Sequence, residues 1–569
     1  MVCYLHTNTK VVNTFKNSGY VLNLKFIFNN RKMKMSIDLM KRIALLFVIL
    51  TNGILVIAQE ADIKSANAEI KKAERLVDID QSIKAMEVLD QAISANPAVT
   101  KLYYYLGYVQ LKTGENGKAL KTFEKGVSLN DKDAINHVGL GAIRMIEKKP
   151  TEAKVFFDKA LALSKSKDVA VLQAIAEAYL VDAKYAETAL KFLEKAKSLD
   201  PNNPKTYMLM GEVDLFQNKG GPAISNCERA ARLYPSNGKP YYNIALVYMR
   251  SQNYALAEEN FQKAISVDSE FTLAYKELGE LYYSMKDGEK AVKAYESYLK
   301  MTENPEEGMV RYAFFLFMSK NYAKATEVFR RQLEKPDVTP TTLKYAAYAE
   351  VEAGNLAEAQ KVFEKYFAAV PVDKIEASDY SYNGKLLQKL NQDSLAVISF
   401  RKSLALNPAQ EDIALLCAEA LLKGKRFPES IEAYVSLMKI RKKPLSLDYY
   451  GLGRAYYYNS QFEKADTAFQ KLIEMQPART IGYVWMSKVK ANQDPNSEQG
   501  LAKPFFEKVI EIGSIEPEKN KKDLIDAYKY LGYYHYLKIE IPVSISFWKK
   551  VLELDSSDAQ AIGVLKELK

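Results

Sequence analysis

Apolar side chains recur at positions i, i+3, i+4 and i+7 in one segment after another along the chain. This spacing gathers the apolar positions on one face of an amphipathic helix. Short polar breaks separate the segments, as at 251–253, 286–288 and 353–355. Such breaks suit the tight connections of antiparallel helical hairpins. The pattern therefore predicts an almost entirely helical chain without a β-sheet.

The hairpins repeat at a nearly constant interval along the chain. A small residue marks the same point of each unit, and a large side chain usually follows it by four positions, as Phe261 follows Ala257. The small residues of this first series are Ala85, Ala119, Ala153, Ala189, Ala223, Ala257, Ala291, Ala325, Ala359, Ala396, Ser430, Ala465, Ala502 and Ser544.

A second series of small residues lies upstream of the first, usually by twelve or thirteen positions. It consists of Gly107, Gly141, Ala176, Gly211, Ala245, Gly279, Ala313, Ala347, Gly384, Ala418, Gly453, Ser487 and Gly532. Two helices that pack about 8–10 Å apart need small side chains where their axes come closest. The two series therefore predict the contact between the two helices of each hairpin, with the large side chain beside it.

These residues resemble the tetratricopeptide-repeat (TPR) family, whose unit of about 34 residues carries Leu-Gly, Tyr, Ala, Phe, Ala and Pro at set spacings. The stretches "AYKELGELYYSMKDGEKAVKAYESYL" (274–299) and "YYGLGRAYYYNSQFEKADTAFQKLIEMQP" (449–477) carry the resemblance most clearly. It covers about residues 66–569. The resemblance implies an all-α fold, a right-handed superhelical solenoid of about 14 helix-turn-helix units.

The array is expected to run continuously over 59–569, with a closing helix at 558–568 to cover the last apolar face. The repeat lengthens at two places, near 371–380 and within 491–522, where we expect hinges.

The net charge of +10 raises the question of nucleic-acid binding. Residues 1–58 hold eight basic side chains and one acidic side chain, which leaves 72 basic and 69 acidic residues, a net charge of +3, for the remainder. Lys and Glu alternate throughout that remainder, whereas a phosphate-binding protein needs a concentrated basic face. We therefore expect no nucleic-acid partner.

The N-terminal region has the layout of a secretory signal peptide at 40–58. Lys41 and Arg42 precede an apolar stretch at 43–57, which predicts cleavage near Ala58 and export to the periplasm or envelope of a Gram-negative bacterium. The alternative is an uncleaved membrane anchor, although the stretch is short for one. Residues 1–39 are interpreted as an upstream extension from a mis-called start.

Few side chains beyond the leader are suited to catalysis or metal binding. Cys227 and Cys417 lie several repeats apart, and because each repeat is expected to touch only its neighbours, we predict two free, buried thiols. His137 and His535 occupy positions that usually pack. A zinc site needs three or four converging ligands. The sequence thus predicts a non-enzyme without metal, cofactor or catalytic residues.

The resemblance implies that the first helix of each unit lines an inner groove. The candidate binding residues expected to be exposed there are Tyr104, Tyr108, Lys205, Tyr242, Lys276, Tyr283, Phe314, Phe317, Lys344, Tyr348, Tyr450, Arg454, Tyr457, Tyr533 and Tyr536. The alternative is that these rings pack between helices. A carboxylate clamp known in some relatives is not carried over, because Glu280 stands where the clamp has Asn.

The expected function is a non-catalytic scaffold that holds a protein or peptide partner in this groove during envelope assembly or secretion. Tyrosine offers a large contact area with a polar tip, which is common at recognition surfaces. The alternative is a polysaccharide-export scaffold whose tyrosines contact glycan.

Overall fold

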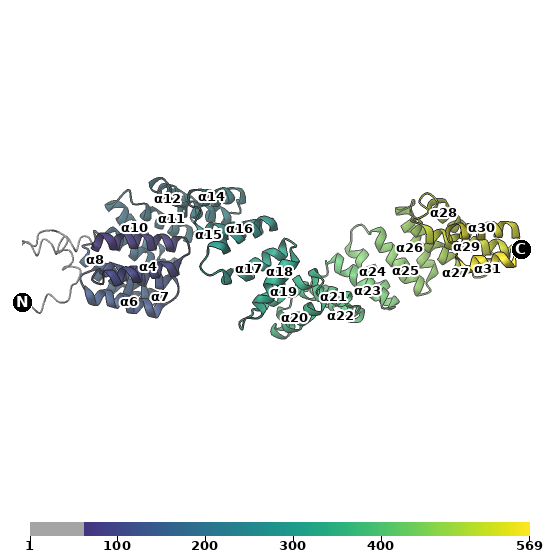
Figure 1. The fold of residues 1–569 in the computed structure, drawn as a ribbon, viewed down its shortest axis with the longest axis horizontal. Helices are drawn as coiled ribbons and strands as arrows, with labels where there is room; N and C mark the ends of the chain where they lie inside the picture. Colours follow the sequence, from purple (N-terminus) through teal and green to yellow (C-terminus); the bar gives the residue numbers. More distant parts are fainter. Residues whose placement is uncertain (1–61, 569) are drawn as a thin grey trace, which may run out of the picture. The chain divides into compact units, whose positions relative to one another are not determined.

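The computed structural model describes residues 62–568, and this part is all-helical, with 78% helix and no strands. The upstream extension and the signal peptide predicted at 1–58 lie outside the described residues. Fourteen helix pairs follow one another, from 62–78 with α4 to α29 with α30, and α31 closes the array (Figure 1). The all-α repeat architecture expected from the sequence is confirmed.

Helix bounds in the first half follow the expected hairpins. After the helix at 62–78 come α4 (Ser82–Ala95), α5 (Thr100–Lys112), α6 (Asn116–Leu129), α7 (Ala134–Ile146), α8 (Pro150–Leu163), α9 (Val169–Tyr179), η1 (Ala183–Tyr185), α10 (Ala186–Leu199), α11 (Pro204–Phe216), α12 (Gly220–Leu233), α13 (Lys239–Arg250), α14 (Tyr254–Val267), α15 (Thr272–Ser284) and α16 (Gly288–Met301).

The second half continues the same alternation. It comprises α17 (Pro305–Met318), α18 (Tyr322–Leu333), α19 (Pro340–Ala353), α20 (Leu356–Ala369), η2 (Val372–Lys374), α21 (Ala377–Lys389), α22 (Asp393–Leu406), α23 (Glu411–Lys423), α24 (Phe427–Ile440), α25 (Ser446–Tyr458), α26 (Phe462–Met475), α27 (Thr480–Gln493), α28 (Lys503–Gly513), α29 (Lys521–Leu537), α30 (Ile541–Leu554) and α31 (Ala559–Glu567).

The chain divides into two compact units. The first runs to Leu281 and includes Met301–Glu303, and the second holds Tyr282–Lys300 and everything from Asn304 onward. The segments at 371–380 and 491–522 both lie inside the second unit, and the hinges expected there stay a prediction.

The contact between the two small-residue series has the expected geometry. A Cβ built on Gly107 would lie 2.4 Å from Cε1 of Phe123, and one on Gly384 would lie 2.4 Å from Cε1 of Phe400. Carbon atoms cannot approach so closely, so only a residue without a side chain leaves room for the ring of the partner helix. The ring fills the space that the missing Cβ leaves, and this contact joins the two helices of the pair.

Serine replaces alanine in two units, and the structure supplies the reason. The Ser430 hydroxyl donates to the carbonyl of Ala418 at 2.9 Å, and the Ser544 hydroxyl donates to the carbonyl of Gly532 at 2.7 Å. Each serine is fully buried. A buried hydroxyl is costly unless it is hydrogen-bonded, and here it is satisfied by the small residue of the facing helix.

The first helices of the pairs form the inner layer of each unit. In the first unit α5 contacts α7, α7 contacts α9, and α11 contacts α13; in the second, α19 contacts α21 and α25 contacts α27. Helices on the inside of a curved array approach one another more closely than those outside. We call the side chains of these first helices that point away from their partners the inner face of a unit.

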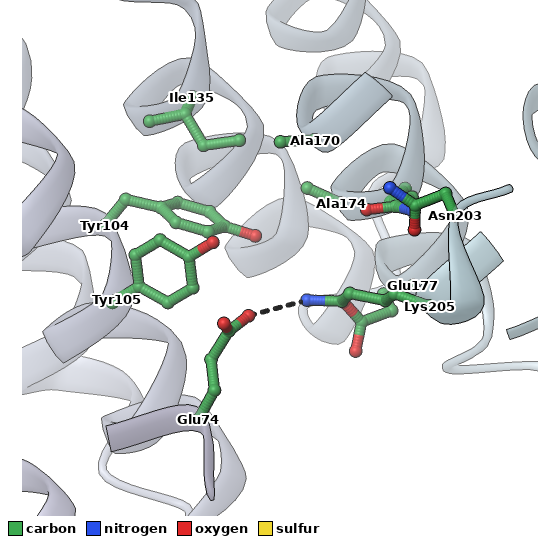
Figure 2. Close-up of a pocket in the computed structure, with 10 residues that line it drawn as sticks. Glu74, Tyr104, Tyr105, Ile135, Ala170, Ala174, Glu177, Asn203 and Lys205 are labelled. Carbon is green, nitrogen blue, oxygen red and sulfur yellow. Dashed lines mark hydrogen bonds and ion pairs between the residues drawn. The ribbon is translucent and has the colours of Figure 1, made fainter. Parts of the chain in front are cut away.

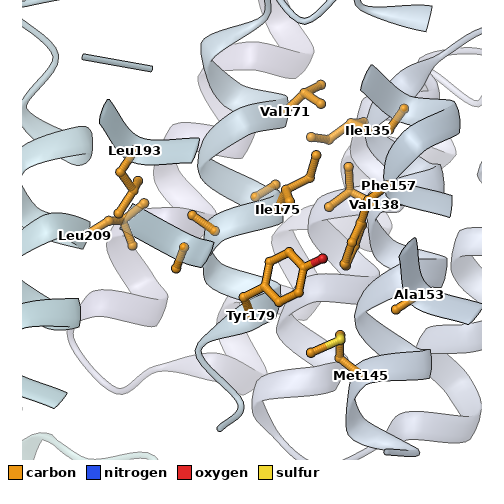
Figure 3. Close-up of a cluster of buried hydrophobic side chains, with 14 of the residues drawn as sticks. Ile135, Val138, Met145, Ala153, Phe157, Val171, Ile175, Tyr179, Leu193 and Leu209 are labelled. Carbon is orange, nitrogen blue, oxygen red and sulfur yellow. The ribbon is translucent and has the colours of Figure 1, made fainter. Parts of the chain in front are cut away.

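Apolar side chains from successive pairs merge into continuous cores. In the first unit, Ile135 and Val138 of α7, Phe157 of α8, and Val171 and Ile175 of α9 pack in one buried cluster (Figure 3). Each pair therefore buries its apolar face against the next, as a stacked array requires.

The lengthened loop after α27 is closed by one carboxylate. Asp494 accepts the backbone N–H groups of Gln499, Gly500 and Leu501 at 3.1, 2.7 and 3.3 Å. Burial raises the pKa of Asp494, but these donors stabilise the carboxylate and the pKa lies below its ordinary value. The insertion that lengthens this repeat is thus an ordered loop.

The two cysteines beyond the leader are free and buried, as predicted. Both histidines in the described part pack as expected. His137 is 2% exposed and its Nε2 lies 2.9 Å from the carbonyl oxygen of Asp131, and His535 lies beside Glu540. Within 62–568 no helix has the length and apolar character needed to cross a membrane.

Replacing Ala257 with Leu should destabilise the protein more than replacing Lys263 with Leu. Ala257 is fully buried where two helices meet, so added bulk should cost about 1–3 kcal/mol. Lys263 is exposed on the same helix and its replacement should stay within about 0.5 kcal/mol. Urea unfolding followed by circular dichroism measures both, and equal midpoints would show that the repeat register is wrong.

Candidate functional site

The inner face of the first unit carries tyrosines around buried charges. Tyr104, Tyr105 and Tyr108 come from α5, whose sequence places three tyrosines in a row at 103–105. Tyr104 is 7% exposed, and the Tyr108 hydroxyl donates to Oε1 of Glu177 on α9 at 2.8 Å. Tyr108 therefore covers a carboxylate, and Tyr104 is buried while Tyr105 and Tyr108 stay partly exposed.

Lys205 of α11 joins that carboxylate to the helix at 62–78 (Figure 2). Its ammonium lies 2.9 Å from Oε1 of Glu74 and 4.0 Å from Oε2 of Glu177. Tyr104 and Tyr105 lie beside this pair, and together these side chains line a pocket of about 190 Å³. The sequence expected Lys205 to be available in the groove, but its charge is already matched inside the chain.

The electrostatics of this network favour the charged forms of Glu177 and Lys205. Burial raises the pKa of Glu177, but Lys205, Lys112 and the Tyr108 hydroxyl stabilise the carboxylate and the pKa lies below its ordinary value. Burial lowers the pKa of Lys205, yet Glu177 and Glu74 keep it above its ordinary value. The contribution of Glu177 to stability is thus complete above the ordinary carboxyl range and is lost as the pH falls through its lowered pKa.

Further ion pairs hold the helix at 62–78 against distant repeats of the first unit. Asp78 lies 3.1 Å from Nζ of Lys239 on α13, which also contacts Glu212 at 3.2 Å. Arg75 pairs with Asp268 after α14. The partners lie 161 and 193 residues apart in the sequence.

The expectation that each repeat touches only its neighbours is therefore wrong in the first unit. Glu303 adds a further contact between distant parts of the first unit. Its carboxylate accepts the backbone N–H groups of Ile83 at 2.7 Å and Lys84 at 2.9 Å. These are the first donors of α4, which have no partner within the helix. The superhelical curvature of the unit brings its first pair back over later ones.

The remaining candidates of the first unit are partly or wholly packed. The Tyr242 ring lies 5.9 Å from that of Phe261 and 5.4 Å from that of Phe271. Burial raises the pKa of its hydroxyl above the ordinary range. Lys276 is half-buried on α15. The aromatic and charged side chains on the inner face of this unit thus largely contact other side chains of the same unit.

Several candidates in the second unit belong to the core, against the expectation that they are exposed. Phe314, Phe317 and Tyr348 are 8%, 9% and 3% exposed. The Phe314 and Phe317 rings lie 4.6 and 6.0 Å from the ring of Tyr345, and half-buried Tyr283 lies 5.3 Å from Phe314. Large aromatic rings at these inner positions contact the next inner helix, which is why they are covered.

Lys344 and Tyr348 satisfy a buried acid. The carboxylate of Asp379, which is fully buried, lies 3.3 Å from Nζ of Lys344 and accepts hydroxyl donors from Tyr348 and Tyr366. It also caps α21 by accepting the N–H of Glu376 at 2.7 Å. These groups stabilise the junction after η2, and their polar atoms are already used.

A different arrangement occurs on α25 and α27 of the second unit. The rings of Tyr450 and Tyr457 stand edge-on to Trp485, at 6.2 and 5.5 Å between centroids. The Arg454 guanidinium lies 5.3 Å from the Tyr450 centroid and 5.6 Å from that of Trp485, and Lys488 places its ammonium 4.9 Å from Trp485. We call these five residues the Trp485 cluster.

The basic groups of the Trp485 cluster have no carboxylate within ion-pair distance among the described residues, in contrast to Lys205, Lys239 and Lys344. The Nε of Arg454 is buried without a hydrogen-bond partner in the described part of the chain. Buried donors are normally satisfied, so such a group calls for an explanation.

Sequence reasoning found Tyr450, Arg454 and Tyr457 but missed Trp485 and Lys488. A signal was present, because Lys488 follows Arg454 by one repeat length and so occupies the same position in the next unit. Trp485 stands one residue away from the position where the pattern places inner side chains, so the periodicity does not mark it as a groove residue.

The described residues contain neither a set of metal ligands nor an activated thiol. Within 62–568 no group of three or more His, Cys, Asp or Glu side chains is placed to hold a metal ion. Burial raises the pKa of the Cys227 thiol to about 12 and also raises that of Cys417. A nucleophilic cysteine needs a lowered pKa, so these thiols are packing groups.

Comparisons with known proteins agree on one family. Two models described as "Tetratricopeptide repeat" match, one over residues 242–308 and the other over 100–133 and 449–479. Among solved structures, the C-terminal part of a TPR repeat-containing protein from Cytophaga hutchinsonii is 35% identical, over 45% of this chain and 98% of that chain, with a TM-score of 0.41.

Two curated relatives come from plants. Anaphase-promoting complex subunit 6 of Arabidopsis thaliana is 30% identical over 182 residues, which are 31% of this chain and 33% of that protein. The Hsp70-Hsp90 organizing protein of Triticum aestivum is 27% identical over 252 residues, 43% of this chain and 41% of that protein. The chain spans less than half the length of these two relatives.

Replacing Lys205 with Met should destabilise the first unit by about 1–3 kcal/mol, because Glu177 would keep a largely buried carboxylate without its cation. Lys219→Met is the matched control. This substitution removes the ion pair between Lys219 and Glu187, which lie 3.2 Å apart and are 48% and 69% exposed. Because the pair is exposed, its loss should lower the free energy of unfolding by less than about 1 kcal/mol. Urea unfolding gives the free energies, and hydrogen exchange of α9 and α11 locates the loss. Equal losses of unfolding free energy for the two substitutions would contradict a stabilising role for the contacts of Lys205 with Glu74 and Glu177.

Proposed function

Because the chain belongs to the tetratricopeptide-repeat family, we propose that it is a non-catalytic scaffold for protein–protein interaction. Its working surface is the inner face of the second unit around the Trp485 cluster, where a segment of a partner protein docks. The observation that carries the proposal is the pair of basic groups on α25 and α27 that lack a carboxylate partner among the described residues. The inner face of the first unit, in contrast, uses its charges on its own helix at 62–78.

Physical chemistry supports recognition at this cluster. Tyr, Trp and Arg are the side chains enriched at energetic centres of protein interfaces. Their rings give a large contact area at little cost in side-chain entropy, and the rings of the cluster are already fixed by mutual contacts. Exposed Leu447 and Tyr458, both 46% exposed on α25, extend the surface with apolar area.

The alternative, a glycan-binding scaffold for polysaccharide export, relies on rings that a sugar can reach. Tyr533 and Tyr536 of α29 are 52% and 47% exposed and favour it. Trp485 is only 8% exposed, so its ring face is not available for stacking. The peptide or protein partner is therefore the better proposal.

We further propose that the scaffold works outside the cytoplasm, in the periplasm or in an envelope complex of a Gram-negative bacterium. The support is the basic and apolar layout of 40–58, which resembles a secretory signal. An assembly or secretion role fits a scaffold in that compartment.

Capture of a partner should depend on the second unit. Wild-type protein and Tyr457→Ala are compared as bait in an envelope extract, with Tyr234→Ala, an exposed tyrosine of the first unit, as the matched control. Loss of an aromatic anchor should reduce retained partner by roughly tenfold or more. Melting curves from circular dichroism confirm that the bait is folded. A folded Tyr457→Ala bait that retains the partner as the control does, or binding only on a glycan array, would refute the proposal.

Export can be tested on the protein itself. Mass spectrometry of the protein from an envelope fraction should find its N-terminus near Gln59, because cleavage is expected next to Ala58. An N-terminus at Met1 in that fraction would contradict both the cleavage and the interpretation of 1–39.

A further inference from the structure

Two basic side chains repeat at one position of successive inner helices. Arg454 of α25 and Lys488 of α27 are separated by one repeat length in the sequence. Their charged groups lie 5.6 and 4.9 Å from the centroid of the same ring, that of Trp485. The ring therefore holds both positive charges in one small area of the inner face, where each gains a cation–π contact.

Three basic side chains near the cluster are neutralised within the chain. Lys490 of α27 pairs with Asp466, and Arg441 before α25 pairs with Asp448 and, at 3.1 Å, with Glu411. On the following inner helix α29, Lys529 pairs with Asp558 at 2.6 Å. Lys464 of α26 and Arg479 before α27 form no ion pair among the described residues either, so what distinguishes Arg454 and Lys488 is that both charges lie against one ring.

One acidic side chain faces the cluster from the preceding inner helix. Glu419 of α23 interacts electrostatically with Arg454 but forms no ion pair with it. Burial raises the pKa of Glu419, and Arg454 acts in the opposite direction. A single half-buried carboxyl at longer range does not satisfy the two basic groups, and the buried Nε of Arg454 keeps an unused donor.

From this arrangement we infer that the partner segment docked on α25 and α27 is acidic, an extended stretch of a protein in which Asp or Glu carboxylates meet Arg454 and Lys488. The inference rests on the proposed scaffold function and adds the chemical class of the partner. Guanidinium groups bind carboxylates through paired hydrogen bonds, and Arg454 is partly exposed. Complementary charge also accelerates the encounter and excludes basic partners.

The apolar neighbours of the cluster add a second requirement on the partner. Leu447 and Tyr458, each 46% exposed on α25, lie on the same helix as Arg454. Alternating acidic and apolar residues in the partner would place carboxylates at the cations and apolar side chains at these two positions. A segment that is acidic throughout would leave them uncovered.

The test uses the full-length protein and three peptides of equal length. One alternates Glu, Asp and Leu, the second replaces the acids by Gln and Asn, and the third replaces them by Lys. Binding is measured by fluorescence anisotropy at about 0.05 M and about 0.5 M salt, because screening weakens contacts between partly exposed charges. We expect the acidic peptide to bind, with roughly tenfold or greater preference over the amide peptide and weaker binding at high salt.

Variants locate the binding. Arg454→Gln with Lys488→Gln should weaken the acidic peptide by roughly tenfold or more. The matched control is Lys471→Gln with Lys508→Gln on α26 and α28, the outer helices of the same two repeats, where both lysines make exposed pairs at 2.7 and 2.6 Å. It removes the same charge and should bind as wild type does. Arg454→Lys with Lys488→Arg keeps the charge and should recover most of the affinity.

Each outcome decides a different question. Equal binding of acidic and amide peptides, or equal effects of the cluster and control variants in folded protein, would overturn the acidic partner while leaving the scaffold function standing. The same holds if the basic peptide binds best. If no peptide of any charge binds and an anionic oligosaccharide does, both the inference and the proposed function fail.

Discussion

The fold depends on a steric contact that recurs in each pair: a residue with little or no side chain on one helix faces a bulky group on the other. At Gly453 a Cβ would lie 2.6 Å from Cε1 of Phe469, and at Gly211 it would lie 2.6 Å from the sulfur of Cys227. Such distances exclude alanine unless the partner side chain moves. The contact sets the distance between the helices of a pair, and through it the direction in which the next pair must stack.

The sequence predicts this part of the structure well because the contact is local. The two members of each contact lie within one repeat, as Gly107 and Phe123 do, so the periodicity alone reveals them. The helical content, the number of pairs, the closing helix and the buried thiols of Cys227 and Cys417 follow from the same pattern.

Contacts between distant repeats could not be read from the sequence in the same way. Whether Lys205 lies close to Glu74 depends on how small rotations between successive helix pairs add up over the first unit. The residue type at a single repeat position does not determine this total rotation. The exposure of side chains on the inner face is equally hard to predict from the sequence. Whether a tyrosine at an inner position is covered depends on the side chains of the adjacent inner helix, as for Tyr348, which stacks 3.8 Å from Tyr382. Trp485 was missed because side chains of the preceding inner helix α25, and not its own repeat position, bring it into the cluster.

The ion pairs of the helix at 62–78 have a consequence for the order in which the first unit is completed. Each later pair can form against the pair that precedes it as the chain emerges, since its contacts are local. The helix at 62–78 acquires its partners Lys205, Lys239 and Asp268 only after those residues have left the ribosome. Vectorial synthesis therefore leaves the acidic and basic side chains of the helix at 62–78 without these partners until the later helices of the unit have been made, and the contacts that close the unit are non-local and form late.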